Sequence, residues 1–212
     1  MNAPSHSGQL LVERADRAMT MLMVGKLRAG SRQGLCRIRN VSIGGMMIET
    51  RLPLACGEEV VIDARGRQEV TGTVVWVLDG RAGVRFAYQL PPDRMLAAVL
   101  EPQSRIARNR VPRGPRVQLH CKVEVQLSSG RVDAMLKDIS QGGAKLIMPV
   151  VMRRHERLLL MVPGLPMKLG LVCWAAEETG IAFAQPLGFD LLAEWLLIRE
   201  AAAPILADAI DG

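Results

Sequence analysis

One turn motif occurs twice in the sequence, and this repeat limits the fold more than any other feature. The motif has the pattern [N/D]-x-S-x-G-G and occupies residues 40–45 and 138–143. The two copies lie 98 residues apart, and Trp76 and Trp174 keep the same separation. A repeat of this length indicates two homologous domains rather than a solenoid of short units. The 212 residues of the chain suit two domains of about 100 residues each.

The motif is typical of a tight turn between two strands. The side chain of an Asx residue accepts hydrogen bonds from nearby backbone N–H groups, a serine supports the same turn, and paired glycines supply positive φ angles. Strand-like runs lie on both sides of each copy. Residues 117–125 alternate apolar and polar side chains, which is typical of an antiparallel sheet with one buried face. Trp76 and Trp174 lie in the middle of later apolar runs, so we expect them in the core.

Each half contains six short strand-like runs separated by turns, which predicts a small antiparallel barrel. The predicted strands of the first half cover 18–27, 34–40, 46–49, 59–63, 69–78 and 83–86. Those of the second half cover 117–125, 132–138, 144–148, 157–161, 167–176 and 181–183. A helix is expected after each barrel, at about 91–100 and 187–202. The predicted fold is therefore mainly β, with two six-stranded β-barrels in tandem, each followed by a C-terminal helix.

The same patterns divide the chain into five segments. They are a flexible N-terminal arm at 1–12, a first domain at 13–100, an arginine-rich linker at 101–112, a second domain at 113–202 and a tail at 203–212. No apolar run approaches the roughly 20 residues that cross a bilayer, and the first ten residues lack the pattern of a signal peptide. These features predict a cytoplasmic protein without a membrane span.

The chemistry of most enzymes is missing from the sequence. His6, His120 and His155 are scattered, and none has a partner at the spacing of a metal site or a catalytic triad. The sequence also has no glycine-rich phosphate-binding loop and no pair of carboxylates with an evident catalytic purpose. The four cysteines show no C-x-x-C spacing, and three lie in apolar strand-like runs, so we expect free thiols in the core. The sequence predicts a protein that is not an enzyme and needs no metal or cofactor.

The charge distribution favours an anionic partner. The net charge is +6, five arginines crowd residues 105–116, and Arg14 and Arg17 precede the first domain. An arginine fork pairs with phosphate and reads the O6/N7 edge of guanine, while the turn motif offers a carboxylate or amide close by. Together they suit a guanine nucleotide with phosphates. Aromatic residues make up only 3% of the chain, so nucleic-acid binding by the basic linker is the weaker alternative.

These features resemble the PilZ family in both halves of the chain. PilZ domains carry R-x-x-x-R just before the first strand and [D/N]-x-S-x-x-G after the second. Residues 72–77 and 83–86, and their counterparts at 170–174 and 180–183, are similar to the family's later strands. The resemblance covers nearly all of residues 14–195. It implies small β-barrels with a terminal helix that serve bacteria as receptors for the second messenger cyclic di-GMP.

The resemblance also implies the binding residues. We expect the second domain to bind first, because it has a carboxylate where the first has an amide, and more arginines precede it. The expected residues there are Arg110, Arg113, Arg116, Asp138, Ser140 and Gly143. In the first domain they are Arg14, Arg17, Asn40, Ser42 and Gly45.

The arginine motif departs from the family pattern, and this leaves two functions open. Both halves have R-x-x-R, which is one residue short. One hypothesis is a receptor in which nucleotide binding at the linker and the barrel rim changes the domain arrangement or the binding of a protein effector. The alternative is an adaptor that has lost nucleotide binding and acts only through protein contacts. The sequence does not identify the effector.

A methionine stripe gives a prediction about association. When the arginines of the two halves are aligned, Met19, Met21 and Met23 fall on the polar face of the first strand. An exposed apolar stripe usually marks a contact. We expect it to pack against the other domain, the N-terminal arm or a second copy in a homodimer. The alternative is that the strand slips its register at Gly25 and buries the methionines in the core.

Overall fold

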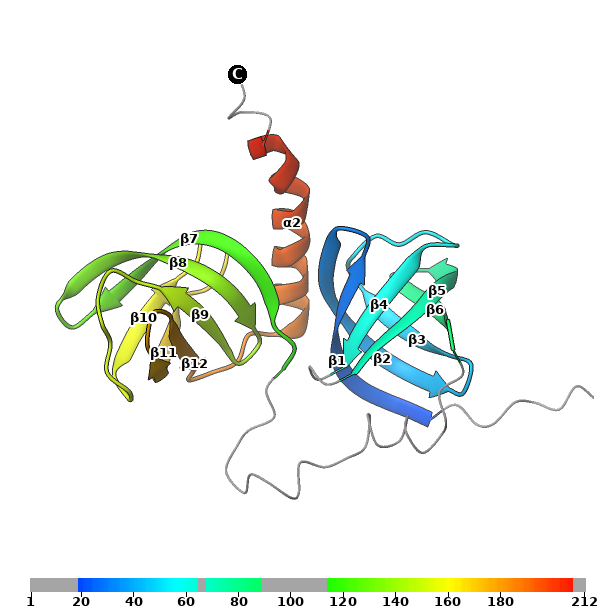
Figure 1. Cartoon of the computed structure of the whole chain (residues 1–212), viewed down its shortest axis with the longest axis horizontal. Helices are drawn as coiled ribbons and strands as arrows, with labels where there is room; N and C mark the ends of the chain where they lie inside the picture. The colour runs from blue at the N-terminus through cyan, green and yellow to red at the C-terminus, as the bar shows by residue number, and fades with distance from the viewer. Residues whose placement is uncertain (1–18, 65–67, 89–113, 208–212) are drawn as a thin grey trace, which may run out of the picture.

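The computed structural model describes residues 19–64, 68–88 and 114–207, with side chains over 23–63, 69–88 and 114–201. These residues form two closed, six-stranded antiparallel barrels and one helix (Figure 1). The strands of the first barrel are β1 (Met19–Ala29), β2 (Arg32–Ser42), β3 (Gly45–Thr50), β4 (Glu59–Ala64), β5 (Gln68–Leu78) and β6 (Arg81–Phe86). Those of the second are β7 (Val117–Leu127), β8 (Gly130–Ser140), β9 (Gly143–Ile147), β10 (Arg157–Met161), β11 (Lys168–Ala175) and β12 (Thr179–Phe183).

The two barrels have the same topology. The first has the strand order β1-β2-β3-β6-β5-β4, and β4 pairs with β1 to close it. The second repeats this order as β7-β8-β9-β12-β11-β10, closed by the pairing of β10 with β7. The predicted tandem of six-stranded barrels is therefore confirmed.

The helix α2 (Phe189–Ala207) follows the second barrel as predicted, although it begins two residues later and ends five residues later than expected. None of the helical segments that the structure describes is long and apolar enough to cross a membrane. The helix expected at 91–100, the arm at 1–12 and the linker at 101–112 lie outside the described residues.

The repeat extends to the irregularities of the strands. Register shifts occur between Thr20 and Met23 in β1 and, 98 residues later, between Gln118 and Cys121 in β7. Met23 therefore matches Cys121, and both side chains are buried in the barrel cores. The predicted exposed stripe is wrong at Met23. The register does slip, as the alternative proposed, but before Met23 rather than at Gly25, while the side chains of Met19 and Met21 lie outside the described part of the chain.

A second pair of bulges corrects the prediction for two tryptophans. Trp76 and Trp174 are 40% and 39% exposed, so they are not core residues. A bulge immediately before each tryptophan turns its side chain from the inner to the outer face of the barrel. Each indole then lies over a glycine of the neighbouring strand. A Cβ atom added to Gly83 would lie 2.0 Å from Nε1 of Trp76, and one added to Gly180 would lie 2.2 Å from Cε2 of Trp174.

The cysteines only partly follow the prediction. Cys36 and Cys121 are buried free thiols, whereas Cys173 is half-buried and Cys56 is exposed. Burial raises the pKa of the Cys36 thiol to about 12. Cys173 lies within the bulge of β11 just before Trp174, which explains why its strand position did not bury it.

The helix α2 lies between the two barrels (Figure 1) and extends the core of the second barrel toward the first. Leu192, Trp195 and Leu196 of α2 are buried in that core. Leu35 of β2 belongs to the same apolar cluster and is 2% exposed, although its strand belongs to the first barrel. The two barrels therefore share a continuous apolar contact through the helix.

Candidate functional site

The two motif turns have the same hydrogen-bonded geometry. In the second barrel Ser140 pairs with Gly143 across a two-residue turn, and its Oγ donates to the Gly143 carbonyl at 3.2 Å. In the first barrel the Oγ of Ser42 donates to the Gly45 carbonyl at 3.1 Å. Ser140 is buried, with 3% exposure. The serine of the motif therefore holds the hairpin closed from inside the turn.

Close approach of a neighbouring strand, not positive φ, explains the second glycine of each motif. None of the four motif glycines is among the residues with positive φ. A Cβ atom on Gly143 would instead lie 2.2 Å from the carbonyl oxygen of Ile181. The equivalent Cβ on Gly45 would lie 2.3 Å from the carbonyl oxygen of Val84. The sequence-based reason for these glycines was wrong, because the constraint comes from the adjacent strand and not from the turn.

A charged cluster surrounds the turn of the second barrel. Nη1 of Arg116, just before β7, pairs with Oδ1 of Asp138 near the end of β8. Nζ of Lys145 lies 3.9 Å from Oδ2 of Asp138 and 2.8 Å from Oε2 of Glu178. The hydrogen bond with Glu178 raises the pKa of Lys145. Asp138 is only 7% exposed, so a nearly buried carboxylate lies between two cations.

The turn of the first barrel is neutral at the matching positions. The strand register pairs Asn40 with Met47, where the second barrel pairs Asp138 with Lys145. A depression of about 300 Å³ lies beside this turn. It is lined by residues that include Asn40, Ser42, Gly45, Trp76 and Arg85. The first turn thus combines an amide, an exposed indole and an exposed arginine.

The structure brings together most of the predicted residues that it describes. In the second barrel, Arg116 meets Asp138, and Ser140 meets Gly143. The predicted Asn40, Ser42 and Gly45 line one depression in the first barrel. The remaining predicted residues lie outside the described part of the chain; they are Arg14, Arg17, Arg110 and Arg113.

Sequence reasoning missed Lys145, Glu178 and Arg85 and placed both tryptophans wrongly. The position of Lys145 could have been predicted from the sequence. In a hairpin with a two-residue turn, counting outward from the turn pairs Ser140 with Gly143 and Asp138 with Lys145. Glu178 and Arg85 come from later strands, so only the complete barrel brings them to the turns.

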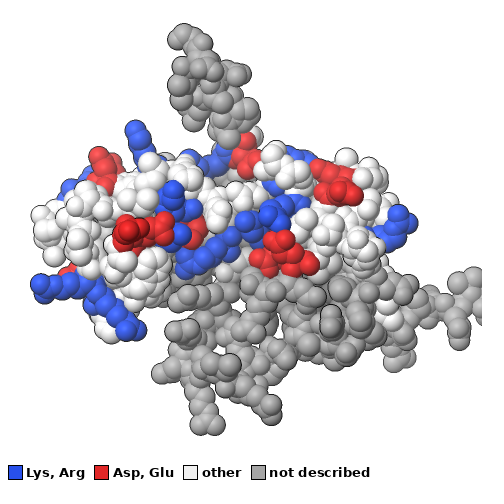
Figure 2. Space-filling model, viewed as in Figure 1, with Lys and Arg blue, Asp and Glu red and all other residues white. Residues whose placement is uncertain are grey.

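Positive charge does not form one continuous patch on the face shown in Figure 2. Basic and acidic side chains alternate along a band that crosses both barrels. Ion pairs between such groups in the described residues include Arg37 and Arg39 with Glu49, and Lys145 with Glu178. A partner that binds here meets local groups of opposite charge rather than a uniform basic surface.

Comparison with known families identifies both halves. The model of the PilZ domain matches residues 12–100 and again residues 109–191. The chain belongs to the PilZ domain family. Both matches include a motif turn and the strands that precede it, so this is a tandem PilZ protein. No curated protein matches the chain significantly.

Solved structures of three bacterial proteins resemble this PilZ protein. The PlzA protein of Borreliella burgdorferi, in complex with c-di-GMP, is 12% identical; the match covers 85% of this chain and 93% of that one, with a TM-score of 0.32. The inhibitor of motility of Bacillus subtilis, MotI/DgrA, is 14% identical over 86% and 98%, with a TM-score of 0.35. YcgR of Escherichia coli, in complex with c-di-GMP, is 12% identical over 89% and 88%, with a TM-score of 0.34. At these scores, the family assignment rests on the domain match.

Proposed function

We propose that this tandem PilZ protein is a non-enzymatic receptor and adaptor for cyclic di-GMP, and that the second barrel binds the nucleotide first. The observation that supports this most is the meeting of Arg116 and Asp138 at the second turn. These residues come from the two sequence regions that carry the motifs of the family, one before the first strand of the barrel and one at the end of the second.

The chemistry of the cluster suits a guanine nucleotide. The Arg116 guanidinium presents a planar fork of donors that matches a phosphate or the O6/N7 edge of guanine. The Asp138 carboxylate accepts hydrogen bonds from the N–H edge of the base more strongly than an amide does. Lys145 neutralises Asp138 while Arg116 turns toward the ligand. Ser140 and Gly143 keep the turn in shape, since both are buried in the hairpin.

The linker carries the proposed coupling to the rest of the molecule. Arg110 and Arg113 precede the cluster by a few residues and supply further phosphate ligands when the nucleotide binds. Holding them at the barrel rim restrains the segment 101–112, which joins the two domains. Nucleotide binding then changes the domain arrangement or the surface that a protein effector meets.

One observation favours the alternative of an adaptor that does not bind nucleotide. Asp138 already has Arg116 and Lys145 as partners, so a ligand must displace an existing ion pair. The shortened R-x-x-R motif points the same way. On this alternative, the barrels act only through contacts with other proteins.

Calorimetric titration of single variants separates these functions. Replacing Arg116 with Ala removes a charged hydrogen-bond partner, which costs about 1.5–3 kcal/mol, or roughly ten- to hundredfold in affinity. Arg131→Ala is the matched control, because Arg131 pairs with Glu124 on an exposed face and should leave affinity unchanged. Arg17→Ala should have much less effect than Arg116→Ala. The reverse ranking would make the first barrel the receptor, and equal affinities of all variants would exclude the proposed site.

A further inference from the structure

Two hydrogen bonds join the motif turn of the second barrel to the residues just before α2. The backbone N–H of Leu187 donates to the carbonyl of Gln141 at 2.7 Å. The side-chain Nε2 of Gln141 donates back to the carbonyl of Leu187 at 3.1 Å. Leu187 is 2% exposed and lies two residues before Phe189, where α2 begins. These two hydrogen bonds therefore join the turn to the residues just before the helix. The first barrel has the apolar Ile43 at the place of Gln141.

The first turn of α2 is in turn fastened to the first barrel by Arg37 of β2. Nη2 of Arg37 lies 3.0 Å from Oδ2 of Asp190, and its guanidinium lies 4.1 Å from the centre of the Phe189 ring. A cation over an aromatic face gains most when it is partly desolvated, and the Arg37 side chain is 23% exposed. Asp190 also lies in the first turn of the helix, where a negative charge is favourable.

Arg37 contacts a second acceptor, which lies within its own barrel. Its Nη1 lies 3.2 Å from Oε1 of Glu49, and Glu49 also accepts from Nε of Arg39 at 2.8 Å. When the start of the helix moves away, Arg37 keeps Glu49 as a partner. Arg39 lies immediately before Asn40 of the first motif turn. The contact chain thus runs from one motif turn to the other.

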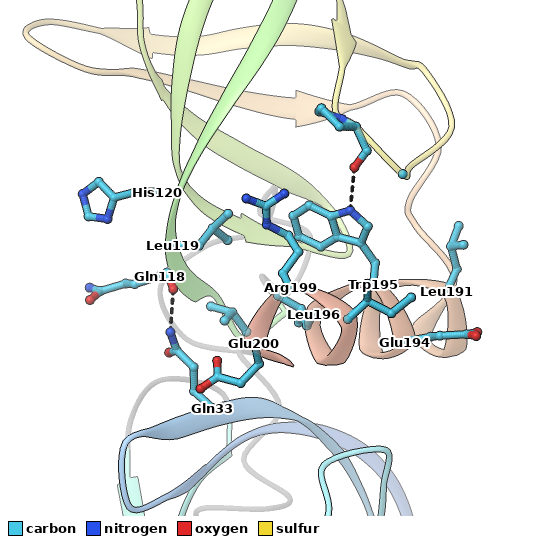
Figure 3. A pocket seen from close by; sticks show the side chains of 14 residues that line it. Gln33, Gln118, Leu119, His120, Leu191, Glu194, Trp195, Leu196, Arg199 and Glu200 are labelled. Carbon is cyan, nitrogen blue, oxygen red and sulfur yellow. Dashed lines mark hydrogen bonds between the residues drawn. The ribbon is translucent and has the colours of Figure 1, made fainter. Parts of the chain in front are cut away.

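Two further contacts support the same junction. Leu35, two residues before Arg37 on the outer face of β2, is buried in the cluster that contains α2. Gln33 lies two residues before Leu35, and its Nε2 donates to the carbonyl of Gln118 in β7 at 2.6 Å (Figure 3). Gln33, Leu35 and Arg37 alternate along β2 and therefore share one face of the strand. All three contact the second domain.

We propose that Gln141 and Arg37 are positioning residues that join the second binding turn to the first barrel through the start of α2. This inference rests on the proposed function, and its route differs from the linker. Nucleotide at the second turn holds the start of the helix in place, and the helix holds β2 of the first barrel through Arg37. By linkage, loosening the junction at Arg37 must weaken nucleotide binding at the distant turn.

A nucleotide-free experiment tests the mechanical link by itself. The unfolding of the full chain is measured for Gln141→Ala, for Arg37→Gln and for the double variant. If both residues act through the start of α2, the double variant loses clearly less stability than the two single losses combined, because either change alone already frees the helix. Gln141→Ala combined with Arg28→Gln is the control and should be additive, since Arg28 pairs with Glu69 on an exposed part of its own barrel. Additivity in both pairs would overturn the proposal.

A titration with cyclic di-GMP tests the transmission. We expect Arg37→Gln to lower the affinity of the second site by at least about fivefold and Arg28→Gln to change it by less than about twofold. Equal effects of the two changes would overturn the transmission. If the wild-type protein does not bind the nucleotide, the proposed function fails, while the unfolding experiment still decides whether the turn and the first barrel are linked.

Discussion

Gly143→Ala tests the finding that a neighbouring strand, rather than the turn, requires this glycine. The new Cβ atom would lie 2.2 Å from the Ile181 carbonyl oxygen, more than 1 Å closer than an ordinary contact between such atoms. That oxygen belongs to the backbone of β12, which pairs with β9. Relief therefore needs the two strands to separate, and this weakens the hydrogen bonds around the pair of Gly143 and Ala182.

The expected loss of stability is the sum of the overpacking by the new Cβ atom and the weakening of hydrogen bonds between β9 and β12. Overpacking of a well-packed site costs about 1–3 kcal/mol, and each weakened backbone hydrogen bond adds about 0.5–1.5 kcal/mol. A total of about 2–4 kcal/mol should lower the melting temperature by roughly 4–16 °C for a chain of this size. Differential scanning calorimetry measures this loss directly.

The neighbouring glycine is a matched control. A Cβ atom on Gly142 would meet nothing within 4 Å, and Gly142 does not have positive φ. Gly142→Ala should therefore melt within about 2 °C of the wild type, which corresponds to a surface change of about 0.5 kcal/mol. If the Ala variants at 142 and 143 melt alike, the strand contact does not explain the glycine.

Two further predictions concern ionisable groups. Burial raises the pKa of Cys36 to about 12, so at pH 8 a disulfide reagent should modify the exposed Cys56 at once and Cys36 only after unfolding; rapid modification of both would contradict the burial. Hydrogen bonds from Arg39 and then Arg37 lower the pKa of Glu49, so the stability that Glu49 contributes is present above its ordinary value of 4.5 and is lost as the pH falls through the lower, folded value. The difference in urea midpoint between the wild type and Glu49→Gln should shrink below that pH, and a constant difference would contradict the assignment.

The strands were predictable because their residues alternate and because every pattern occurs twice. Whether a side chain points into the barrel or toward its outer surface was predictable only where the alternation is unbroken, as in residues 121–127. Bulges interrupt it before Trp76 and Trp174, and a bulge inserts one residue without changing the apolar character of the strand. The sequence therefore predicted a core position for side chains that lie on the outer surface.

The candidate site shows the same limit at longer range. The pairing of Arg116 with Asp138 agrees with the motif regions, and Lys145 follows from the two-residue turn by counting. The contact of Arg37 with Asp190 joins residues 153 positions apart in different domains. The sequence around each residue does not indicate this contact, because each is typical of an exposed charged side chain. The contact forms only when the two barrels lie on either side of α2. Contacts of this kind depend on the assembled chain.

Titration of the 212-residue chain with cyclic di-GMP, with GTP as the control, tests the receptor proposal most directly. Isothermal calorimetry should give saturable heat with cyclic di-GMP and none with GTP at the same concentrations. The heat should fall strongly in Arg116→Ala, because the second barrel binds first. Absence of heat with cyclic di-GMP would contradict the proposal and favour the adaptor. Equal heat with both nucleotides would also contradict the proposal, because it would show binding without preference for cyclic di-GMP.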